Sequence, residues 1–384
     1  MGSPLVHRMQ GFGSTIFAEM TALATEHGAV NLGQGFPDTD GPPEMLAAAK
    51  AAIDGGRNQY PPGPGVPELL DAVAAHQKRF YDLEVDPRSE VLVTVGATEA
   101  IAATILALCE VGDEVVTFEP YYDSYAASIA LAGAVRRTSV LRFPDFAVDE
   151  DSLRAAFSPR TRMVLLNTPH NPTGKVFVRG ELDLICSLAR EHDAWVVTDE
   201  VYEHLVFGDA THVPVATLPG MRERTLTISS AGKTFSATGW KVGWVSGPTE
   251  VVAAVRAVKQ FLTFVGSGPF QPAVAVALGL DDEVYAGFAT SLQAKRDLLV
   301  AGLRSAGLSM SVPAGTYFVV ADAAPLGAVD ALSFCRELPK RAGVVGVPVS
   351  VFHDDVDAAR TLVRFAFCKR DEVLHDAVDR LSRL

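Results

Sequence analysis

Seven short runs rich in β-branched residues alternate with longer segments of helical periodicity between residues 90 and 246. The helical segments place apolar residues three and four positions apart, as in 98–109 and 179–192. Because parallel strands must be joined by a long crossover that is usually a helix, this alternation predicts an α/β fold with a mainly parallel sheet and helices on both faces. The expected strands are 91–95, 114–118, 135–140, 163–167, 194–198, 225–229 and 241–246.

The pattern changes after residue 280. Strand-like runs at 315–321, 344–348 and 363–367 lie among helices, and an amphipathic helix is expected at 371–381. A chain of 384 residues with 48% hydrophobic content is long enough for about two domains of the usual size. We therefore expect a second, smaller α+β domain that begins near residue 281.

The chain is acidic, with 33 Lys and Arg residues against 46 Asp and Glu residues. The formal charge of −13 argues against nucleic acid and anionic membranes as partners. The four cysteines show no Cys-x-x-Cys or Cys/His spacing, which favours a reducing compartment and argues against a structural zinc, so no metal is expected. No signal-peptide pattern and no apolar run of ~18 residues is present, so we expect a cytoplasmic protein.

Ligands of open α/β sheets bind beside the carboxyl ends of the strands, so the residues after each strand form the candidate site. Gly96, Ala97 and Thr98 follow the first strand and open a helix. Their backbone N–H groups and the threonine hydroxyl suit an anion such as phosphate. The same residues also suit an ordinary tight turn with Thr98 as the helix N-cap.

Aromatic and amide side chains follow two further strands. Tyr121, Tyr122 and Tyr125 either pack between domains or supply a ring that stacks on a planar heterocycle. Asn171 stands between two prolines, which hold its amide in a fixed direction toward a ligand oxygen. The neighbouring His170 has no carboxylate placed beside it, and we expect it to stabilise the turn rather than act as a base.

Asp199 ends the apolar run 194–198. A buried aspartate is costly unless it pairs with a cation or a protonated nitrogen, and the alternative is a plain helix N-cap. Tyr202 follows three residues later, which on a helical turn brings its hydroxyl to the same side. The two residues therefore form a candidate pair in one site.

The stretch 229–244 contains Ser230, Lys233 and Lys241 among small and hydroxyl residues. A lysine packed among small neighbours loses hydration, so its pKa falls and its neutral amine becomes available for Schiff-base chemistry. A phosphate-binding P-loop is excluded, because that motif requires glycine where Thr227 stands. The spaced glycines of a dinucleotide-binding fold are also missing after the first strand.

Together the strand ends supply an amine, a carboxylate for a ring nitrogen, donors for a ring oxygen, an aromatic ring and a phosphate site. Pyridoxal 5'-phosphate requires this whole set. Each element alone is weak evidence, whereas the combination is specific.

The same residues resemble those of fold-type-I, class I aminotransferases, and the stretch 229–244 is similar to the cofactor-lysine signature of the kynurenine/glutamine aminotransferase branch (cysteine-conjugate β-lyases). Segments 40–43, 60–65, 202–207 and 269–277 look most like actinobacterial N-succinyldiaminopimelate aminotransferases. One departure from many class I enzymes is Lys241, which stands where they have arginine. The resemblance extends over nearly the whole chain, through 31–38, 58–60, 96–100, 119–125, 167–175, 199–202, 315–318 and 364–369.

The resemblance implies roles for individual residues. Lys233 would bind the cofactor and move the substrate proton, Asp199 would keep the ring nitrogen protonated, and Tyr202 with Asn171 would bind the ring oxygen. Arg364 would bind the substrate α-carboxylate in a site lined by Gly35 and Asn167. The cofactor-binding set implied by the family is completed by Gly96, Ala97, Thr98, Tyr122, Ser230, Lys241 and, from a second subunit, Tyr60.

The resemblance also implies an architecture and an activity. Residues 33–280 would form a large cofactor-binding domain with a seven-stranded sheet, and 1–32 with 281–384 a small domain that closes over substrate in a homodimer. The reaction would move an amino group from an L-amino acid to a 2-oxo acid, for which 2-oxoglutarate is the first candidate. N-Succinyldiaminopimelate, or glutamine, methionine and aromatic amino acids, are the candidate donors.

Two other functions stay open on the residues alone. A carbon–sulfur β-lyase would use the same side chains, and a ligand-sensing module would bind without turnover, although no basic helix-turn-helix segment is present. The donor side chain is the least determined feature. Aromatic candidates for an apolar pocket are Phe12, Phe36, Tyr60, Phe264 and Phe352.

Overall fold

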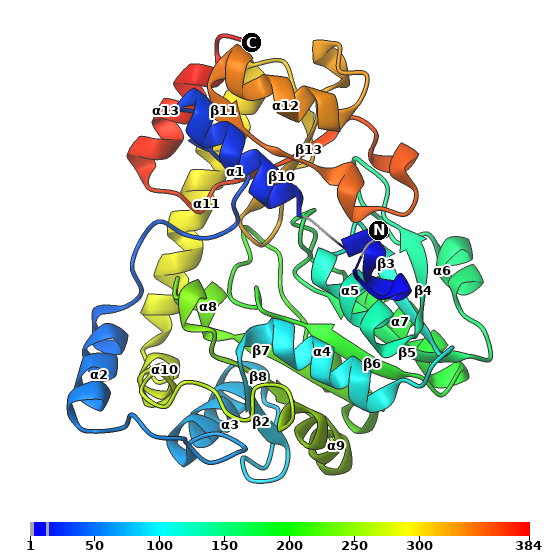
Figure 1. Cartoon of the computed structure of the whole chain (residues 1–384), viewed down its shortest axis with the longest axis vertical. Coiled ribbons are helices and arrows are strands. Elements are labelled where there is room, and N and C mark those ends of the chain that lie inside the picture. The colour runs from blue at the N-terminus through cyan, green and yellow to red at the C-terminus, as the bar shows by residue number, and fades with distance from the viewer. Residues whose placement is uncertain (1–3, 13–14) are drawn as a thin grey trace.

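The computed structural model describes residues 4–12 and 15–384, and it contains a seven-stranded sheet with helices on both faces (Figure 1). The mainly parallel α/β sheet is confirmed, and each predicted strand is present within two residues of its predicted ends. One strand, β8, runs antiparallel to both of its neighbours, β2 and β7. The order is β2 (Val91–Thr94), β8 (Gly243–Ser246), β7 (Thr225–Ser230), β6 (Trp195–Asp199), β5 (Thr161–Asn167), β3 (Glu114–Glu119), β4 (Val135–Val140).

The central strands are buried on both faces, which explains their continuous apolar sequences. Successive residues enter different cores, so that Val196 of β6 packs in one hydrophobic cluster and Val197 in another.

The helices are α1 (Ile16–His27), α2 (Pro43–Asp54), α3 (Pro67–Tyr81), α4 (Gly96–Leu108), α5 (Asp123–Ala132), α6 (Glu150–Ala156), α7 (Arg179–Glu191), α8 (Ala231–Thr234), α9 (Thr249–Lys259), α10 (Phe270–Leu278), α11 (Asp282–Ser305), α12 (Ala331–Ala342) and α13 (Asp371–Leu381).

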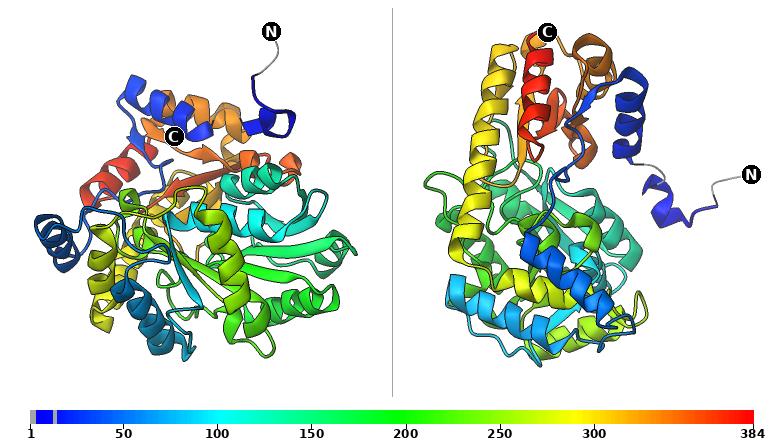
Figure 2. Two further views of the ribbon diagram at one scale, coloured as in Figure 1. Left: turned by 60° about the horizontal axis from the view of Figure 1, so that its bottom comes forward. Right: turned by 90° about the vertical axis from the view of Figure 1, so that its left-hand side faces the viewer.

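A second, antiparallel sheet lies in the C-terminal part of the chain, in the order β12 (Val347–Pro348), β13 (Leu362–Ala366), β10 (Phe318–Asp322), β9 (Ser309–Met310). The N-terminal segment joins this part, because β1 (Val30–Asn31) pairs with β11 (Val344–Val345) and α1 packs on α12 (Figure 1). Helix α11 runs alongside both parts of the molecule (Figure 2). Among the described residues, no helix is both long and apolar enough to cross a membrane.

Two predicted strands differ in detail from the structure. The run 344–348 is divided into β11 and β12, because the chain changes sheets at Gly346, where a Cβ atom would lie 2.6 Å from Val363. The run 315–321 begins later, at Phe318, since Thr316 adopts a φ of +64° that a strand cannot accommodate.

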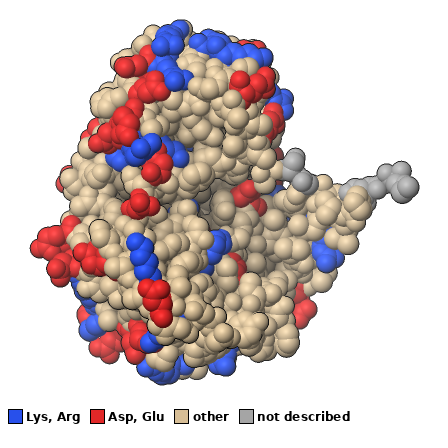
Figure 3. Space-filling model, turned by 60° about the vertical axis from the view of Figure 1, so that its left-hand side comes forward, with Lys and Arg blue, Asp and Glu red and all other residues tan. Residues whose placement is uncertain are grey.

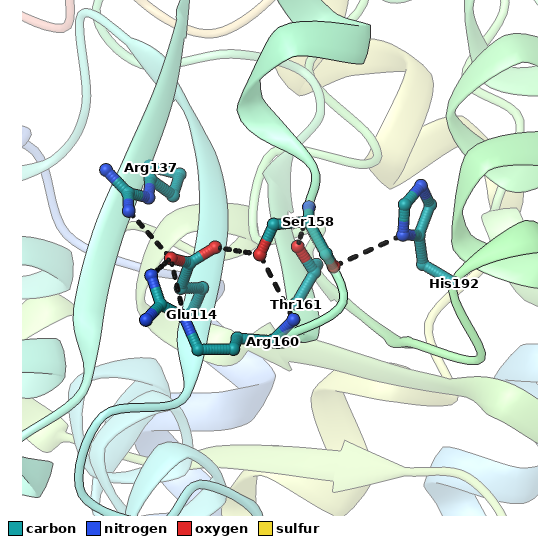
Figure 4. Close-up of polar contacts among 6 residues, drawn as sticks. All are labelled: Glu114, Arg137, Ser158, Arg160, Thr161 and His192. Carbon is teal, nitrogen blue, oxygen red and sulfur yellow. Dashed lines mark hydrogen bonds and ion pairs between the residues drawn. The ribbon is translucent and has the colours of Figure 1, made fainter.

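Glu114 holds the amino-terminal ends of three strands together, opposite the edge where ligands are expected (Figure 4). Its carboxylate accepts hydrogen bonds from Arg137 of β4 at 2.7 Å, and from Ser158 and Arg160 before β5, both at 2.6 Å. The hydrogen bonds from these partners, Arg137 first, lower the pKa of Glu114 to about 2.

Candidate active site

A cavity of about 330 Å³ lies at the carboxyl ends of the parallel strands. Thirteen of the fourteen residues predicted for the site line it. Only Tyr60 does not, since its side chain is 81% exposed and its ring contacts Phe264. The predicted residues in the lining are Gly35, Gly96, Ala97, Thr98, Tyr122, Asn167, Asn171, Asp199, Tyr202, Ser230, Lys233, Lys241 and Arg364.

Lys233 projects from α8, which begins immediately after β7. Its amine donates a hydrogen bond to the Tyr317 hydroxyl at 3.1 Å, and that hydroxyl donates to the Gly35 carbonyl at 2.8 Å. Burial lowers the pKa of Lys233 to about 8, so a substantial fraction of the amine is neutral near physiological pH. Lys233 also lines a second cavity, of about 410 Å³, whose lining includes Glu283 and Lys295 of α11.

Asp199 ends β6 with its side chain buried. Its Oδ2 atom accepts a hydrogen bond from the Tyr125 hydroxyl at 2.6 Å, and its backbone carbonyl accepts one from Asn167 at 2.8 Å. Burial raises the pKa of Asp199 to about 6. The other oxygen, Oδ1, accepts only a long bond of 3.4 Å from the Val201 N–H, which leaves capacity for a protonated ring nitrogen.

The predicted phosphate site joins the start of α4 to the residues around α8. Helix α4 begins at Gly96 and has no side-chain N-cap, so the alternative in which Thr98 caps the helix is wrong. Gly96 has a φ of +72°, and a Cβ atom there would lie 3.1 Å from the Lys241 amine. A helix N-terminus, two hydroxyls from Thr98 and Ser230, and one ammonium group therefore face the same cavity, a donor set that fits a phosphate.

Arg364 lies in β13, inside a cage of aromatic rings. Its guanidinium is 4.2 Å from the ring centre of Phe318 and donates hydrogen bonds to the Gly33 carbonyl at 2.8 Å and Asn171 at 3.2 Å. Burial lowers its pKa to about 10. The buried Nε atom has no partner among the described residues, so the guanidinium retains a free donor for a carboxylate.

Several site residues are identified only by the structure. Tyr317 directly precedes β10 and Phe318 begins it; the family resemblance covers 315–318, but no role was predicted for either ring, because both look like ordinary core aromatics. Of the predicted pocket aromatics only Phe36 lines the cavity, together with Phe17 and Phe318. His170 is buried and bonded to Thr173 at 2.8 Å, with a pKa lowered by burial to about 3, in agreement with its expected role in a turn.

Comparison with known proteins assigns this site to a class. A model of the family "Aminotransferase class I and II" matches residues 27–381, so the chain belongs to that family and is an aminotransferase. The chain is 53% identical to a probable N-succinyldiaminopimelate aminotransferase of Mycobacterium tuberculosis, over 99% of this chain and 98% of that protein. It is 40% identical to the methionine aminotransferase of Escherichia coli, over 100% and 99% of the two chains.

Solved structures agree with this assignment. The structure of N-succinyldiaminopimelate aminotransferase from Mycobacterium tuberculosis superposes with a TM-score of 0.96 at 54% identity, covering 98% of this chain and 99% of that one. An aspartate aminotransferase from Thermus thermophilus superposes with a TM-score of 0.90 at 34% identity over both full chains. The predicted fold type and family are therefore confirmed.

Proposed function

We propose that the protein binds pyridoxal 5'-phosphate in this cavity and uses it to move an amino group from an L-amino acid to a 2-oxo acid. The proposal rests on one observation: Lys233, with its pKa lowered by burial, shares one cavity with the buried Asp199 and with the phosphate-type donor set at Gly96. When bound, the cofactor supplies a ring that takes up the electron pair left after the substrate Cα proton is removed.

The chain's own residues divide the remaining tasks. Asp199 holds a proton at the ring nitrogen, and Lys233 removes and returns the proton at the substrate Cα atom. Tyr202 and Asn171 would donate hydrogen bonds to the ring oxygen, and Tyr122 would supply the aromatic face of the ring site. Ala97, Thr98, Ser230 and Lys241 bind the phosphate around the turn that Gly96 permits.

Arg364 binds the substrate α-carboxylate through its free donor, with Asn167 and Gly35 beside it. Gly35 is required there because a Cβ atom would lie 2.4 Å from the ring of Phe318. The aromatic cage excludes water, which strengthens the pairing of the two charges.

We infer that N-succinyldiaminopimelate is the amino donor and 2-oxoglutarate the acceptor, an inference supported by the 53% identical relative. The second candidate is methionine or an aromatic amino acid, supported by the aromatic lining of Phe17, Phe36 and Phe318 and by the methionine aminotransferase relative. The cations of the cavity, Lys233, Lys241 and Arg364, all have other tasks. A succinyl carboxylate would therefore need a cation from outside this lining.

We further propose a homodimer in the cytoplasm, with Tyr60 completing the partner's phosphate site. Tyr60, Phe261 and Phe264 are exposed by 81%, 84% and 51%, which is unusual for large apolar side chains of a monomer. Sedimentation should give twice the chain mass, and Tyr60→Phe should weaken cofactor binding.

The proposed domain division is 33–280 for the large domain and 1–32 with 281–384 for the small one. It is supported by the pairing of β1 with β11 and by the packing of α1 on α12. Closure of the small domain over substrate would protect the reacting carbanion from water.

The test is a half-reaction panel in which the absorbance of the cofactor reports which amino acids convert it to its amine form. N-Succinyldiaminopimelate is expected to react fastest, and faster conversion by methionine would favour the second candidate. Lys233→Ala should abolish turnover while the fold persists. Release of pyruvate and a thiol without any oxo acid would instead identify a β-lyase.

A further inference from the structure

Three side chains of types that commonly bind metals lie close together next to Tyr202 of the candidate active site. His76 lies on α3, and Glu203 with His204 lies on the turn that follows β6. One ligand atom from each residue falls within a group whose members all lie within 4.8 Å of one another. The prediction that no metal is bound rested on the spacing of the cysteines. That spacing gives no sign of this group, because His76 and His204 are 128 positions apart in the sequence.

The hydrogen bonds within this group leave two of its polar atoms without a partner. The Nε2 atoms of His76 and His204 are 2.6 Å apart, and Ser229 donates to Oε1 of Glu203 at 2.5 Å. The second oxygen of Glu203 and the Nδ1 atom of His76 are buried without a hydrogen-bond partner among the described residues. An ionised carboxylate in this position requires positive charge nearby.

Residues 4–12 and 15–384 supply no such lysine or arginine within ion-pair distance of Glu203. Glu203 is 3% exposed, and none of the ion pairs formed by the described residues includes it. Arg79, whose charge acts on the neighbouring His76, is itself paired with Asp282.

We propose that His76, Glu203 and His204 bind one divalent cation of the zinc class. Two imidazole nitrogens and a carboxylate oxygen are a donor set that zinc prefers. Bonds of about 2.0 Å to a tetrahedral ion place ligand atoms roughly 3.3 Å apart. The two imidazole nitrogens would therefore separate by less than about 1 Å, which small side-chain rotations allow.

The surroundings indicate a structural ion rather than a catalytic one. The rings of Phe80 and Tyr285 lie 4.6 and 4.5 Å from the ring of His204 and shield the group from water. Tyr81 is a candidate for the fourth ligand, because its hydroxyl lies close enough to act on the Glu203 carboxylate without forming one of the hydrogen bonds described above. The ion would fasten α3 to the turn that follows Asp199 and contains Tyr202.

The proposed metal site is also connected to the phosphate-binding side of the active-site cavity. Ser229, which donates to Glu203, immediately precedes Ser230 of the phosphate donor set. A bound ion would thus act as a positioning element for two groups of site residues without touching substrate. The inference does not depend on the identity of the substrate or on the proposed cofactor.

The experiment is a Zn²⁺ titration of the chelator-treated holoenzyme, with a chromophoric chelator as competitor. One ion per chain is expected. His76→Asn, Glu203→Gln and His204→Asn should each weaken binding by at least the ~10- to 100-fold that loss of a supporting residue causes. His192→Asn is the matched control, because His192 is partly buried and bonded to the Ser158 carbonyl, and it should leave the affinity unchanged.

A second measurement uses the unsubstituted protein and so does not depend on the folding of variants. Co²⁺ should give the visible absorption of a tetrahedral ion with nitrogen and oxygen ligands, and anomalous scattering from a Zn²⁺-soaked crystal should show a peak between the three side chains. No saturable binding at one ion per chain, equal affinity in the three variants, or a peak elsewhere would overturn the proposal.

Discussion

The hydroxyl of Tyr125 donates a hydrogen bond to Asp199 across 2.6 Å, which joins α5 to the end of β6. Both side chains are buried, at 2% and 4% exposure. The bond stabilises the ionised carboxylate, whereas burial opposes it, so Tyr125 acts on the charge of Asp199 rather than on substrate.

Tyr125→Phe should therefore raise the pKa of Asp199 further and reduce kcat/KM at pH 7 by roughly 10- to 100-fold, the usual value of a hydrogen bond to a charged group. The loss should shrink toward pH 9, where the carboxylate is ionised in both proteins. Profiles of kcat/KM against pH provide the measurement. Tyr121→Phe is the control, since that hydroxyl bonds Asp354 instead. A loss that does not vary with pH would contradict this role.

Lys233→Met should stabilise the cofactor-free protein. Burial lowers the pKa of the lysine from 10.5 to about 8, so the folded state binds its proton less tightly than the unfolded state does. The resulting penalty is fully present below pH 8, declines as pH rises, and is gone above 10.5. It amounts to at most about 3 kcal/mol.

Thermal unfolding of the cofactor-free proteins at pH 7 and pH 10 tests this. The melting temperature of Lys233→Met should exceed that of the parent at pH 7, and the difference should narrow at pH 10. Lys50→Met, at an exposed position of α2, controls for the loss of a charge. A difference of the same size at both pH values would argue against the penalty.

Arg364→Lys should raise KM for the amino acid and the oxo acid by ~100-fold or more. A lysine ammonium lacks the planar fork with which Arg364 bonds Gly33 and Asn171 and still keeps Nε free for a carboxylate, and hydrogen bonds to charged groups contribute about 1.5–3 kcal/mol each. Cofactor affinity should change far less than KM, because Arg364 contributes nothing to the phosphate donor set and touches the cofactor site only through Asn171. Steady-state kinetics and cofactor titration measure both quantities, with the exposed Arg370→Lys as the control.

Glu114→Gln should destabilise the protein in a pH-dependent manner. The folded-state pKa of Glu114, lowered from 4.5 to about 2, gives stability that is present above pH 4.5 and is lost as pH falls toward 2. We expect about 2 kcal/mol at pH 7, because the exposed guanidiniums of Arg137 and Arg160 are screened by solvent. Denaturant unfolding at pH 7 and pH 3 should show the difference shrinking, and the exposed Glu110→Gln should show none.

The seven strands and most of the cavity lining were predictable because each depends on local sequence. Apolar runs define the strands, and the carboxyl-end rule selects the residues that follow them. The rule applies even to Lys241, which precedes a strand, because β8 runs antiparallel and so begins at the same edge. The family resemblance added Arg364 and Gly35, for which no local pattern exists.

The remaining features depend on contacts between distant residues. Nothing near Tyr125 distinguishes it from Tyr121 or Tyr122, and only the packing of α5 against β6 brings its hydroxyl to Asp199. Tyr317 reaches Lys233 over a separation of 84 positions. Thr98 has the chemistry of an N-cap, but the helix begins two residues earlier, where Gly96 allows a positive φ.

Lys233 belongs to the lining of two cavities, of about 330 and 410 Å³. Truncating its side chain in Lys233→Ala frees space that borders both cavities, and we expect a small primary amine to occupy it from the α11 side while substrate occupies the first cavity. Methylamine, as the base that removes and returns the substrate Cα proton, should then restore measurable turnover in proportion to its concentration, whereas the bulkier trimethylamine should restore much less. The amine of Lys233 would then be replaceable by a free amine from solution.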